Sequence, residues 1–497
     1  MGSEELDIHA PCKVRIAELE CTIVAMKVAH QAELVAAVQA AVLPLMKRIN
    51  ELEERVKLNS KTTNRPPSSD FPPPAVPPPK SQNPRKRGGQ PGHPPHTRVL
   101  VPVNEVTSLI HNVPGSCGNC RASLRNLLGP DDPQPLRFQY LELPDAAIEV
   151  HENQVHTRRC RCCGHLTSAV LPNDVPQGMV GPKLQAFMAI LTTQFELSKR
   201  QVEQFLVLQY GEKAKLSVGT ISNTEGRTAE SLESVWEEAR IALSEEKRLH
   251  ADETHWPEEA AIRYMWVLIG LTLKIGLYHI NRRTKVVFQK LLPIFGGVGH
   301  SDRYAVYRLF GDNWQICWAH LGRDFKRLEL REDESQKIGK ACLEAKDSFF
   351  EIWWTFKKGL IDRTKLQELV KPFQTKILET LREGKNCKNP KTATFCGNLL
   401  SLWPNMWLFL KIEGVEPTNN EGERAARKAV LLRKKSYGTD SARGSRFIER
   451  MLTVIESCRR QGRNALEFVT KVIEAGLKNL EPPSLVQRRV EEVPAPA

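Results

Sequence analysis

The stretch "KRLHADET", Lys247–Thr254, marks the point where the sequence changes from helical to strand-like patterning. Two adjacent apolar runs follow in "IRYMWVLIGLTLKIGLYHI", Ile262–Ile280, and they join near Gly270. Both runs are rich in β-branched and aromatic residues, which are typical of strands. We therefore predict a strand that carries Asp252, followed by a hairpin.

The next two segments extend this sheet. "KVVFQKLLPIF", Lys285–Phe295, is predicted to be a helix, and "GGVGHSDRYAVY", Gly296–Tyr307, supplies a short strand ending at Asp302. This order predicts a mixed sheet with Asp252 and Asp302 at the ends of neighbouring strands. Three strands and a crossover helix open a ribonuclease-H-like sheet, so the fold class predicted for the core is α/β.

A third acidic position follows an all-α insertion, predicted at roughly 321–410. In "EPTNNEGERAAR", Glu416–Arg427, the Thr and Asn residues are natural N-caps, so a helix is expected to start near Glu421. Glu423 lies in its first turns, where the helix dipole favours a carboxylate. Glu421 and Glu423 face different directions, so only one of them is expected to point at the sheet.

Three carboxylates that meet at one place repel one another until divalent cations neutralise them. Carboxylate oxygens favour hard cations such as Mg²⁺ or Mn²⁺. Two such ions about 4 Å apart clamp an in-line displacement at phosphorus. Water as the attacking group cuts a DNA strand, and the released 3′-OH as the attacking group joins it to another DNA.

Composition narrows the class of protein. A chain of 497 residues is expected to form several domains, and a formal net charge of +13 favours a polyanionic partner, usually nucleic acid. The N-terminus "MGSEELDIHA" lacks an apolar signal core, and no run approaches about 20 continuous apolar residues, so we expect neither secretion nor a membrane span. Twelve cysteines are too few for a disulfide scaffold at this length and are expected to remain thiols or bind metal.

Residues 1–60 are predicted to form a coiled-coil helix that makes a homodimer or a higher homo-oligomer through residues 14–56. An apolar seam with a period of 3.5 residues indicates this, although a single amphipathic helix on the protein's own core is the alternative. The seam runs through Val14, Ala17, Cys21, Val24, Val28, Gln31, Val35, Val38, Val42, Leu45, Ile49, Leu52 and Val56.

Residues 61–100 are predicted to be an extended basic linker, because twelve prolines lie between Arg65 and Pro95. Its basic cluster, Arg85, Lys86 and Arg87, is expected to follow DNA phosphates or enter a minor groove; a merely solvated linker is the alternative.

Two cysteine pairs predict a structural zinc site in a zinc-ribbon-like module at 101–175. Cys117 and Cys120 form one pair, and Cys160 and Cys163 form the other, so together they offer four thiolates for a tetrahedral ion. Short apolar runs between the pairs, at 138–143 and 147–150, suit hairpin strands. Residues 180–245 are predicted to be helical, either as a helix-turn-helix that opens at Ser217 or as a plain helical domain.

Several segments resemble the transposases of the insertion-sequence-66 family, in the DDE superfamily. They are "ADET", "SDRYAVY", "CWAHLGRDF", "PTNNEGERAAR" and "RQGRNALEF". The resemblance implies catalytic, metal-binding roles for Asp252, Asp302 and Glu423, with Glu421 as the less expected third ligand. It also places His320, in a Cys-x-x-His motif, near these acids, where it would orient phosphate or water; a core histidine is the alternative.

The resemblance implies a bacterial, cytoplasmic, nucleoid-associated enzyme that acts on the terminal inverted repeats of its element and on target DNA. The alternatives are an inactive DNA-binding derivative and a nuclease of the same fold without strand transfer.

Further basic residues are expected to contact DNA, with a solvated surface as the alternative: Arg424, Arg427, Arg433, Lys434 and Lys435. The remaining boundaries predicted are a first core segment at 246–325, the helical insertion at 326–412, a second core segment at 413–480 and a disordered tail at 481–497.

Overall fold

The chain divides into two units, one of residues 1–75, 153–206 and 215–497, and the other of residues 76–152 and 207–214. The computed structural model describes residues 10–56, 100–124, 133, 136–141, 147–163, 165–176, 178–259 and 261–487. The predicted linker lies almost wholly outside these residues, as do Arg85, Lys86 and Arg87.

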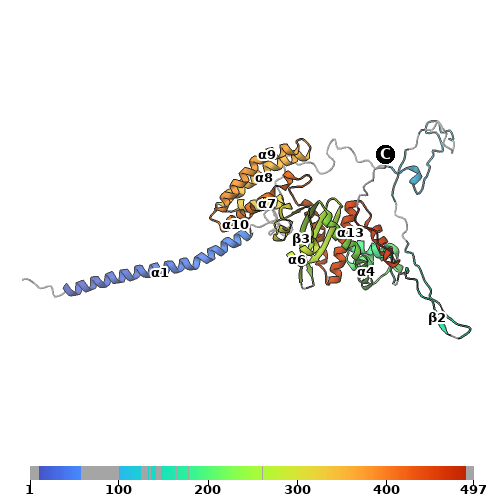
Figure 1. Ribbon diagram of the computed structural model, residues 1–497, viewed down its shortest axis with the longest axis horizontal. Helices are drawn as coiled ribbons and strands as arrows, with labels where there is room; N and C mark the ends of the chain where they lie inside the picture. The colour runs from blue at the N-terminus through green and yellow to red at the C-terminus, as the bar shows by residue number, and fades with distance from the viewer. Residues whose placement is uncertain are drawn as a thin grey trace, which may run out of the picture. The chain divides into compact units, whose positions relative to one another are not determined.

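A five-stranded mixed sheet with the order β5-β4-β3-β6-β7 forms the centre of the first unit (Figure 1). Its strands are β3 (Arg248–Glu258), β4 (Ala261–Gly270), β5 (Ile275–Asn281), β6 (Val298–Ser301) and β7 (Trp314–Ile316). The first three are antiparallel, whereas β6 and β7 run parallel to β3. The predicted α/β core is therefore confirmed, including the hairpin near Gly270. Helix α6 (Lys285–Leu291) makes the crossover and ends before Pro293, shorter than predicted.

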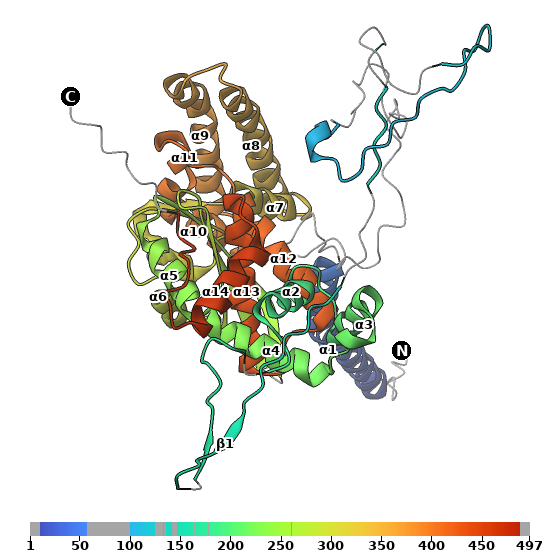
Figure 2. The same cartoon turned by 90° about the vertical axis from the view of Figure 1, so that its right-hand side faces the viewer.

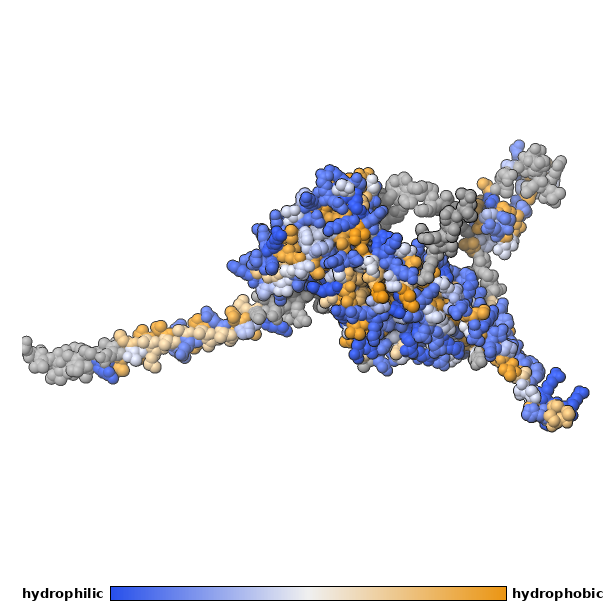
Figure 3. All heavy atoms as spheres, viewed as in Figure 1, coloured by the Kyte–Doolittle hydropathy of each residue, from blue (hydrophilic) through white to orange (hydrophobic). Residues whose placement is uncertain are grey.

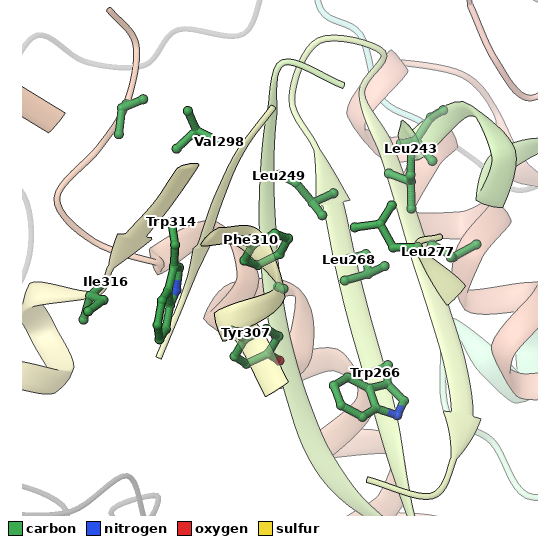
Figure 4. Close-up of a cluster of buried hydrophobic side chains, with 14 of the residues drawn as sticks. Leu243, Leu249, Trp266, Leu268, Leu277, Val298, Tyr307, Phe310, Trp314 and Ile316 are labelled. Atoms are coloured by element: carbon green, nitrogen blue, oxygen red, sulfur yellow. The ribbon is translucent and has the colours of Figure 1, made fainter. Parts of the chain in front are cut away.

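Alternating residues of β3 bury into two different cores because successive side chains point to opposite faces. Leu249 and Ala251 join a large cluster that also contains Tyr307 and Phe310 of the 3-10 segment η5 (Ala305–Asn313). Figure 4 shows Leu249, Tyr307 and Phe310 within it. On the other face Trp256 packs with residues of α12 (Asn420–Ser436) and α13 (Ala442–Gln461). The sheet is thus covered on both faces.

Helices precede the sheet, as the sequence predicted for 180–245. They are α2 (Pro182–Thr193), α3 (Lys199–Tyr210), η3 (Glu212–Ala214), α4 (Val218–Ser231), α5 (Glu233–Ala242) and η4 (Leu243–Glu245). Ser217 caps α4, since its Oγ accepts the N–H of Thr220 at 3.1 Å. One side of α4, including Thr224 and Ala229, is buried against α13 and α2. This helix therefore helps to pack the core.

The predicted helical insertion also forms, and α8 and α9 lie side by side in it (Figure 2). Its elements are α7 (Trp318–Glu329), α8 (Ser335–Lys357), α9 (Arg363–Lys385), α10 (Pro390–Ser401), η6 (Trp403–Met406) and α11 (Leu408–Lys411).

The chain after α14 (Ala465–Leu477) continues along the core. Leu485 is fully buried, and its N–H donates to Glu238 at 2.9 Å. The prediction of a disordered tail is therefore wrong for residues 481–487, because the buried side chain of Leu485 and its backbone hydrogen bond anchor them. The later residues lie outside the described part of the chain.

The first helix, α1 (Ala10–Val56), is continuous through Pro44, and apolar side chains are exposed along it (Figure 3). Val24, Val28 and Leu45 of the predicted seam are each at least 60% exposed, so they are available to a partner helix. A segment of this helix, Cys21–Met46, has a mean hydropathy of 1.3 and is long and apolar enough to cross a membrane. Length and composition alone do not show insertion, so the expectation that no segment spans a membrane stays a prediction.

The cysteine-containing region has less regular structure than predicted. Apart from the short helix η2 (Val103–Glu105), its only regular elements among the described residues 100–176 are β1 (Thr157–Arg159) and β2 (Leu166–Ser168). The predicted strands at 138–143 and 147–150 are wrong where they are described, since no strand forms there. Phe138 is 90% exposed, so this apolar run has no surface against which a strand could pack.

Candidate active site beside the parallel strands

The register of the parallel strands brings Asp252 and Asp302 together. His250 of β3 pairs with His300 of β6. The same register, extended by two residues, sets Asp302 opposite Asp252 on the same face, and neighbouring strands lie about 4.8 Å apart. The N–H of Tyr304 donates to Asp302 Oδ1 at 2.9 Å and fixes this carboxylate just beyond the end of its strand.

The next parallel strand, β7, leads into the Cys-x-x-His motif. The N–H of Cys317 donates to Ser301 O at 2.9 Å, which places this cysteine beside the end of β6. Helix α7 begins at the next residue, so His320 projects from its first turn. Cys317 is fully buried, and burial raises the pKa of its thiol to about 12.

Asn419 fixes the start of α12 against the sheet. Its Nδ2 donates to Ala251 O at 2.8 Å, and its Oδ1 lies 2.9 Å from His250 Nδ1. Its backbone N–H donates to Cys317 Sγ at 3.2 Å. Although Asn is a favourable N-cap, the side chain of Asn419 makes no capping bond here, because both of its polar atoms bind β3. This residue links the third acidic segment to the sheet and to the start of α7.

Glu423 projects from the first turn of α12 toward the turn between β7 and α7. Its Oε1 lies 3.3 Å from His320 Nδ1, 3.7 Å from Arg323 and 3.9 Å from Cys317 Sγ. Arg323 is therefore the arginine at this carboxylate. Arg427, one helical turn beyond Glu423, is exposed.

Glu421 points elsewhere. Its carboxylate binds Arg424 at 2.8 Å and Arg460 at 3.0 Å. Burial acts to raise its pKa, but the hydrogen bond and the charge of Arg460 outweigh burial, so the pKa is lowered. The structure thus neutralises Glu421 with arginines and leaves Glu423 on the side of the aspartates.

The acids on that side all have raised pKa values. Burial raises the pKa of Asp252 most, and the charges of Glu253, Asp302 and Glu423 raise it further. Burial also raises the pKa of Asp302 against the opposing effects of the Tyr304 N–H and nearby arginines. For Glu423, burial is again the largest cause, and Asp302 adds to it. Burial therefore opposes ionisation of all three predicted acids, and the charge of Asp302 adds to this effect at Asp252 and Glu423.

Sequence reasoning missed Glu253, which is adjacent to Asp252 but points to the opposite face. Its side chain is buried and binds Arg283 and the Tyr307 hydroxyl. Burial raises its pKa, as does the charge of Asp302. Its strand position, one residue from Asp252, was the available signal, since adjacent strand residues face opposite sides.

The three acids do not converge on one point at the distance that a single ion requires. In the part of the chain that the structure describes, the one group of three potential ligand atoms within 4.8 Å is Cys317, His320 and Glu423. Burial and the charge of Arg323 lower the pKa of His320 to about 3, so its imidazole is neutral.

The predicted DNA-binding residues of α12 divide into two groups. Arg424, Arg427, Lys434 and Lys435 are exposed. Arg433 instead donates to Thr254 Oγ1 at 3.0 Å and to the backbone of β3, so it anchors α12 to the sheet. DNA contact by Arg433 stays a prediction, and its guanidinium has partners on β3 in this structure.

Each cysteine pair forms a tight turn within its own unit. The pKa of Cys117 is lowered by the backbone N–H groups of Cys120 and Asn119. The pKa of Cys160 is lowered in the same way by Cys163 and Cys162, and Cys163 also contacts the Cys160 side chain. Both turns favour thiolates, but the pairs belong to different units, and the four-thiolate zinc site remains a prediction.

A helix with a stripe of exposed basic residues beside buried acids is typical of proteins that bind nucleic acid. Residues 177–446 match the family model described as Transposase IS66 family, and the chain belongs to this family. Residues 10–99 match a second model, of a family of unknown function. The chain is also 26% identical over 384 residues to the uncharacterized protein y4hP of Sinorhizobium fredii (strain NBRC 101917 / NGR234). The aligned region covers 70% of this chain and 68% of that protein. The resemblance drawn from the sequence is thereby confirmed.

Proposed function

We propose that this transposase cuts DNA at the ends of its element and joins the resulting 3′-OH to target DNA, using Asp252, Asp302 and Glu423 in a ribonuclease-H-like core. The single observation that carries the proposal is the parallel register of β3 and β6, which sets the two aspartates side by side. The sheet order and the docking of α12 by Asn419 support it, because they bring Glu423 to the same edge.

The donor set fits hard divalent cations. Burial raises the pKa of all three acids, and bound cations would relieve the cost of ionising them together. Asp252, Asp302 and Glu423 do not form one group of ligand atoms within 4.8 Å of one another, and this wider spacing suits a pair of ions better than a single ion. Two Mg²⁺ or Mn²⁺ ions, when bound, activate the attacking oxygen and stabilise the leaving oxygen.

The surrounding residues orient the acids. Asn419 holds the start of α12, so Glu423 keeps its direction, and the Tyr304 N–H holds Asp302. Arg323 lies beside Glu423, where its guanidinium would bind a scissile phosphate oxygen. His320 is buried and neutral; it would position the phosphate or the attacking water through a hydrogen bond, without accepting a proton near neutral pH.

Helix α12 supplies a path for the DNA. It has 17 residues and extends about 25 Å, close to seven base-pair steps. Exposed Arg424, Arg427, Lys434 and Lys435 follow it away from Glu423. At its far end lies a cavity of about 890 Å³ whose lining includes Arg200. The basic helix would therefore bind phosphates of the strand that enters the acid site.

Two further elements complete the proposal. The exposed apolar seam of α1 would pair with the same helix of a second copy, giving a homodimer or a higher assembly. One structural Zn²⁺ would join the turn at Cys117 and Cys120 to the turn at Cys160 and Cys163. The basic linker that carries Arg85, Lys86 and Arg87 would add phosphate contacts.

A strand-transfer assay tests the function. Purified protein, Mg²⁺ and a pre-cut DNA duplex that carries the element end should give joined product. Asp302→Asn should abolish cutting and joining but retain binding to the end. Asp347→Asn, which changes an exposed acid of α8, is the matched control and should keep all three activities.

Other outcomes would assign the chain differently. Cutting without joining would identify a nuclease of the same fold, and binding alone would identify an inactive DNA-binding derivative. Full activity in Asp302→Asn would remove this residue from the mechanism.

A further inference from the structure

A second kind of ligand set lies directly beside the proposed magnesium site. It contains Cys317 Sγ, a ring nitrogen of His320 and a carboxylate oxygen of Glu423, all within 4.8 Å of one another. Cys317 and His320 come from the turn that opens α7, whereas Glu423 comes from α12. The three groups therefore meet only in the folded core.

We propose that Cys317, His320 and Glu423 form a binding site for a borderline-soft divalent cation such as Zn²⁺. In tetrahedral zinc sites the metal lies about 2.3 Å from sulfur and 2.0–2.2 Å from nitrogen or oxygen, so ligand atoms stand roughly 3.4–3.7 Å apart. Here Glu423 Oε1 is 3.9 Å from Cys317 Sγ and 3.3 Å from His320 Nδ1. These spacings differ from a zinc tetrahedron by only a few tenths of an ångström.

His320 provides an independent sign of a missing partner. The residue is only 9% exposed, and its Nδ1 is buried without a hydrogen bond. The nearby Glu423 oxygen lies 3.3 Å away, within range of an ion pair, but makes no hydrogen bond with this nitrogen. Buried polar atoms are rarely left without partners, and a metal ion would satisfy this nitrogen.

The groups around the cysteine suit a coordinated thiolate. The Asn419 N–H donates to Cys317 Sγ at 3.2 Å, which is the type of outer contact that orients a metal ligand. Arg323 contacts the Glu423 oxygen at 3.7 Å, but a carboxylate has about four lone-pair sites and can bind a guanidinium and a metal together. Three protein ligands leave a fourth position for water.

The chemistry of the two sites differs, although Glu423 belongs to both. Asp252 and Asp302 offer only oxygen atoms, which favour Mg²⁺, whereas sulfur and imidazole nitrogen favour Zn²⁺. If the proposed function is correct, zinc would hold Glu423 on the Cys317 side and withdraw it from the aspartates. Zinc would then inhibit DNA cleavage by competing for one shared carboxylate.

Cobalt provides a direct test of the site. The full-length protein, with its zinc module loaded, is titrated with Co²⁺ and followed by absorption spectroscopy. We expect a thiolate-to-cobalt charge-transfer band in the wild-type protein and in Cys458→Ser, a control that changes another fully buried cysteine. The band should be lost in Cys317→Ser and weakened at least tenfold in apparent affinity in Glu423→Gln, which removes a ligand from a less buried position.

The result does not depend on DNA cleavage. Absence of the band from the wild-type protein, its persistence in folded Cys317→Ser, or an unchanged apparent affinity for Co²⁺ in folded Glu423→Gln would overturn the site. Circular dichroism of each variant checks folding, and Glu423→Gln decides the matter if Cys317→Ser unfolds.

Inhibition is then measured separately, as the ratio of cleavage with and without Zn²⁺ within each protein. We expect Cys317→Ser to need at least tenfold more zinc than Cys458→Ser for the same ratio. Equal zinc sensitivity of the two variants would overturn the inhibitory role. A cobalt band in a protein without any cleavage activity would instead contradict the proposed function and leave the metal site standing.

Discussion

Replacing Asn419 with alanine should show how strongly the start of α12 depends on β3. Asn419 is 1% exposed, and its side chain makes two buried bonds, to Ala251 O at 2.8 Å and to His250 Nδ1 at 2.9 Å. The substitution leaves both partners without a bond, and each such group costs about 1–3 kcal/mol. Asn419→Ala should therefore lower the free energy of unfolding of the core by about 2–6 kcal/mol.

Guanidinium denaturation followed by tryptophan fluorescence measures this loss. All nine tryptophans lie between Trp236 and Trp407, so the signal reports on the sheet and the helical insertion. Asn389→Ala is the matched control, because the Asn389 side chain caps α10 through the N–H groups of Lys391 and Thr392. Loss of this cap should cost about 1 kcal/mol. A cost for Asn419→Ala no larger than that of Asn389→Ala would refute the reasoning.

Four further results are expected. Gly422→Ala should destabilise the core by about 1–3 kcal/mol in denaturant unfolding, because the new Cβ would lie 2.9 Å from the Asn419 amide. The control Gly397→Ala, in a helix where the new Cβ meets nothing, should stabilise the protein by about 0.5–1 kcal/mol. A Gly422→Ala protein more stable than the wild type would contradict the close approach. Because the pKa of Asp252 is raised in the folded protein, proton binding by Asp252 stabilises the fold fully below about pH 4, and this stabilisation is lost as the pH rises through the folded pKa. In metal-free buffer, the melting temperature of Asp252→Asn minus that of the wild type should therefore grow from about pH 5 to about pH 8. A constant difference would argue against the buried charge. Tyr437→Gly should stabilise by about 1 kcal/mol in denaturant unfolding, since Tyr437 has φ 60°, and a loss of stability would show that its ring makes an unrecognised contact. The purified protein should carry about one zinc per chain in the cysteine module, and Cys117→Ser should release it in a metal analysis; an unchanged zinc content would exclude Cys117 as a ligand.

The strand order and the pair of aspartates were predictable because local patterns decide them. A hairpin and a crossover helix leave few ways to arrange β3, β4, β5 and β6, and parallel pairing then sets Asp302 beside Asp252. The start of α12 was predictable from the Thr and Asn residues before it.

Long-range side-chain choices were not predictable from such patterns. Asn419 has the sequence of an N-cap, but its side chain binds a strand 168 residues earlier in the chain. Arg427 has helical spacing from Glu423, yet Arg323 of α7 makes the contact. Arg433 belongs to a basic run but binds β3 instead of remaining free. In each case a partner from another element decides the outcome, and no local spacing encodes it.

The attachment of α12 to β3 has a consequence for the newly made protein. Roughly 170 residues separate Asp252 from Glu423, and ribosomes add about 5–20 residues per second, so the first acid is complete some 10–30 s before the third is added. For about the last 120 of these residues the nascent chain carries both aspartates but not yet Glu423. The order of synthesis alone therefore delays the assembly of the three-acid group until most of the core has been made.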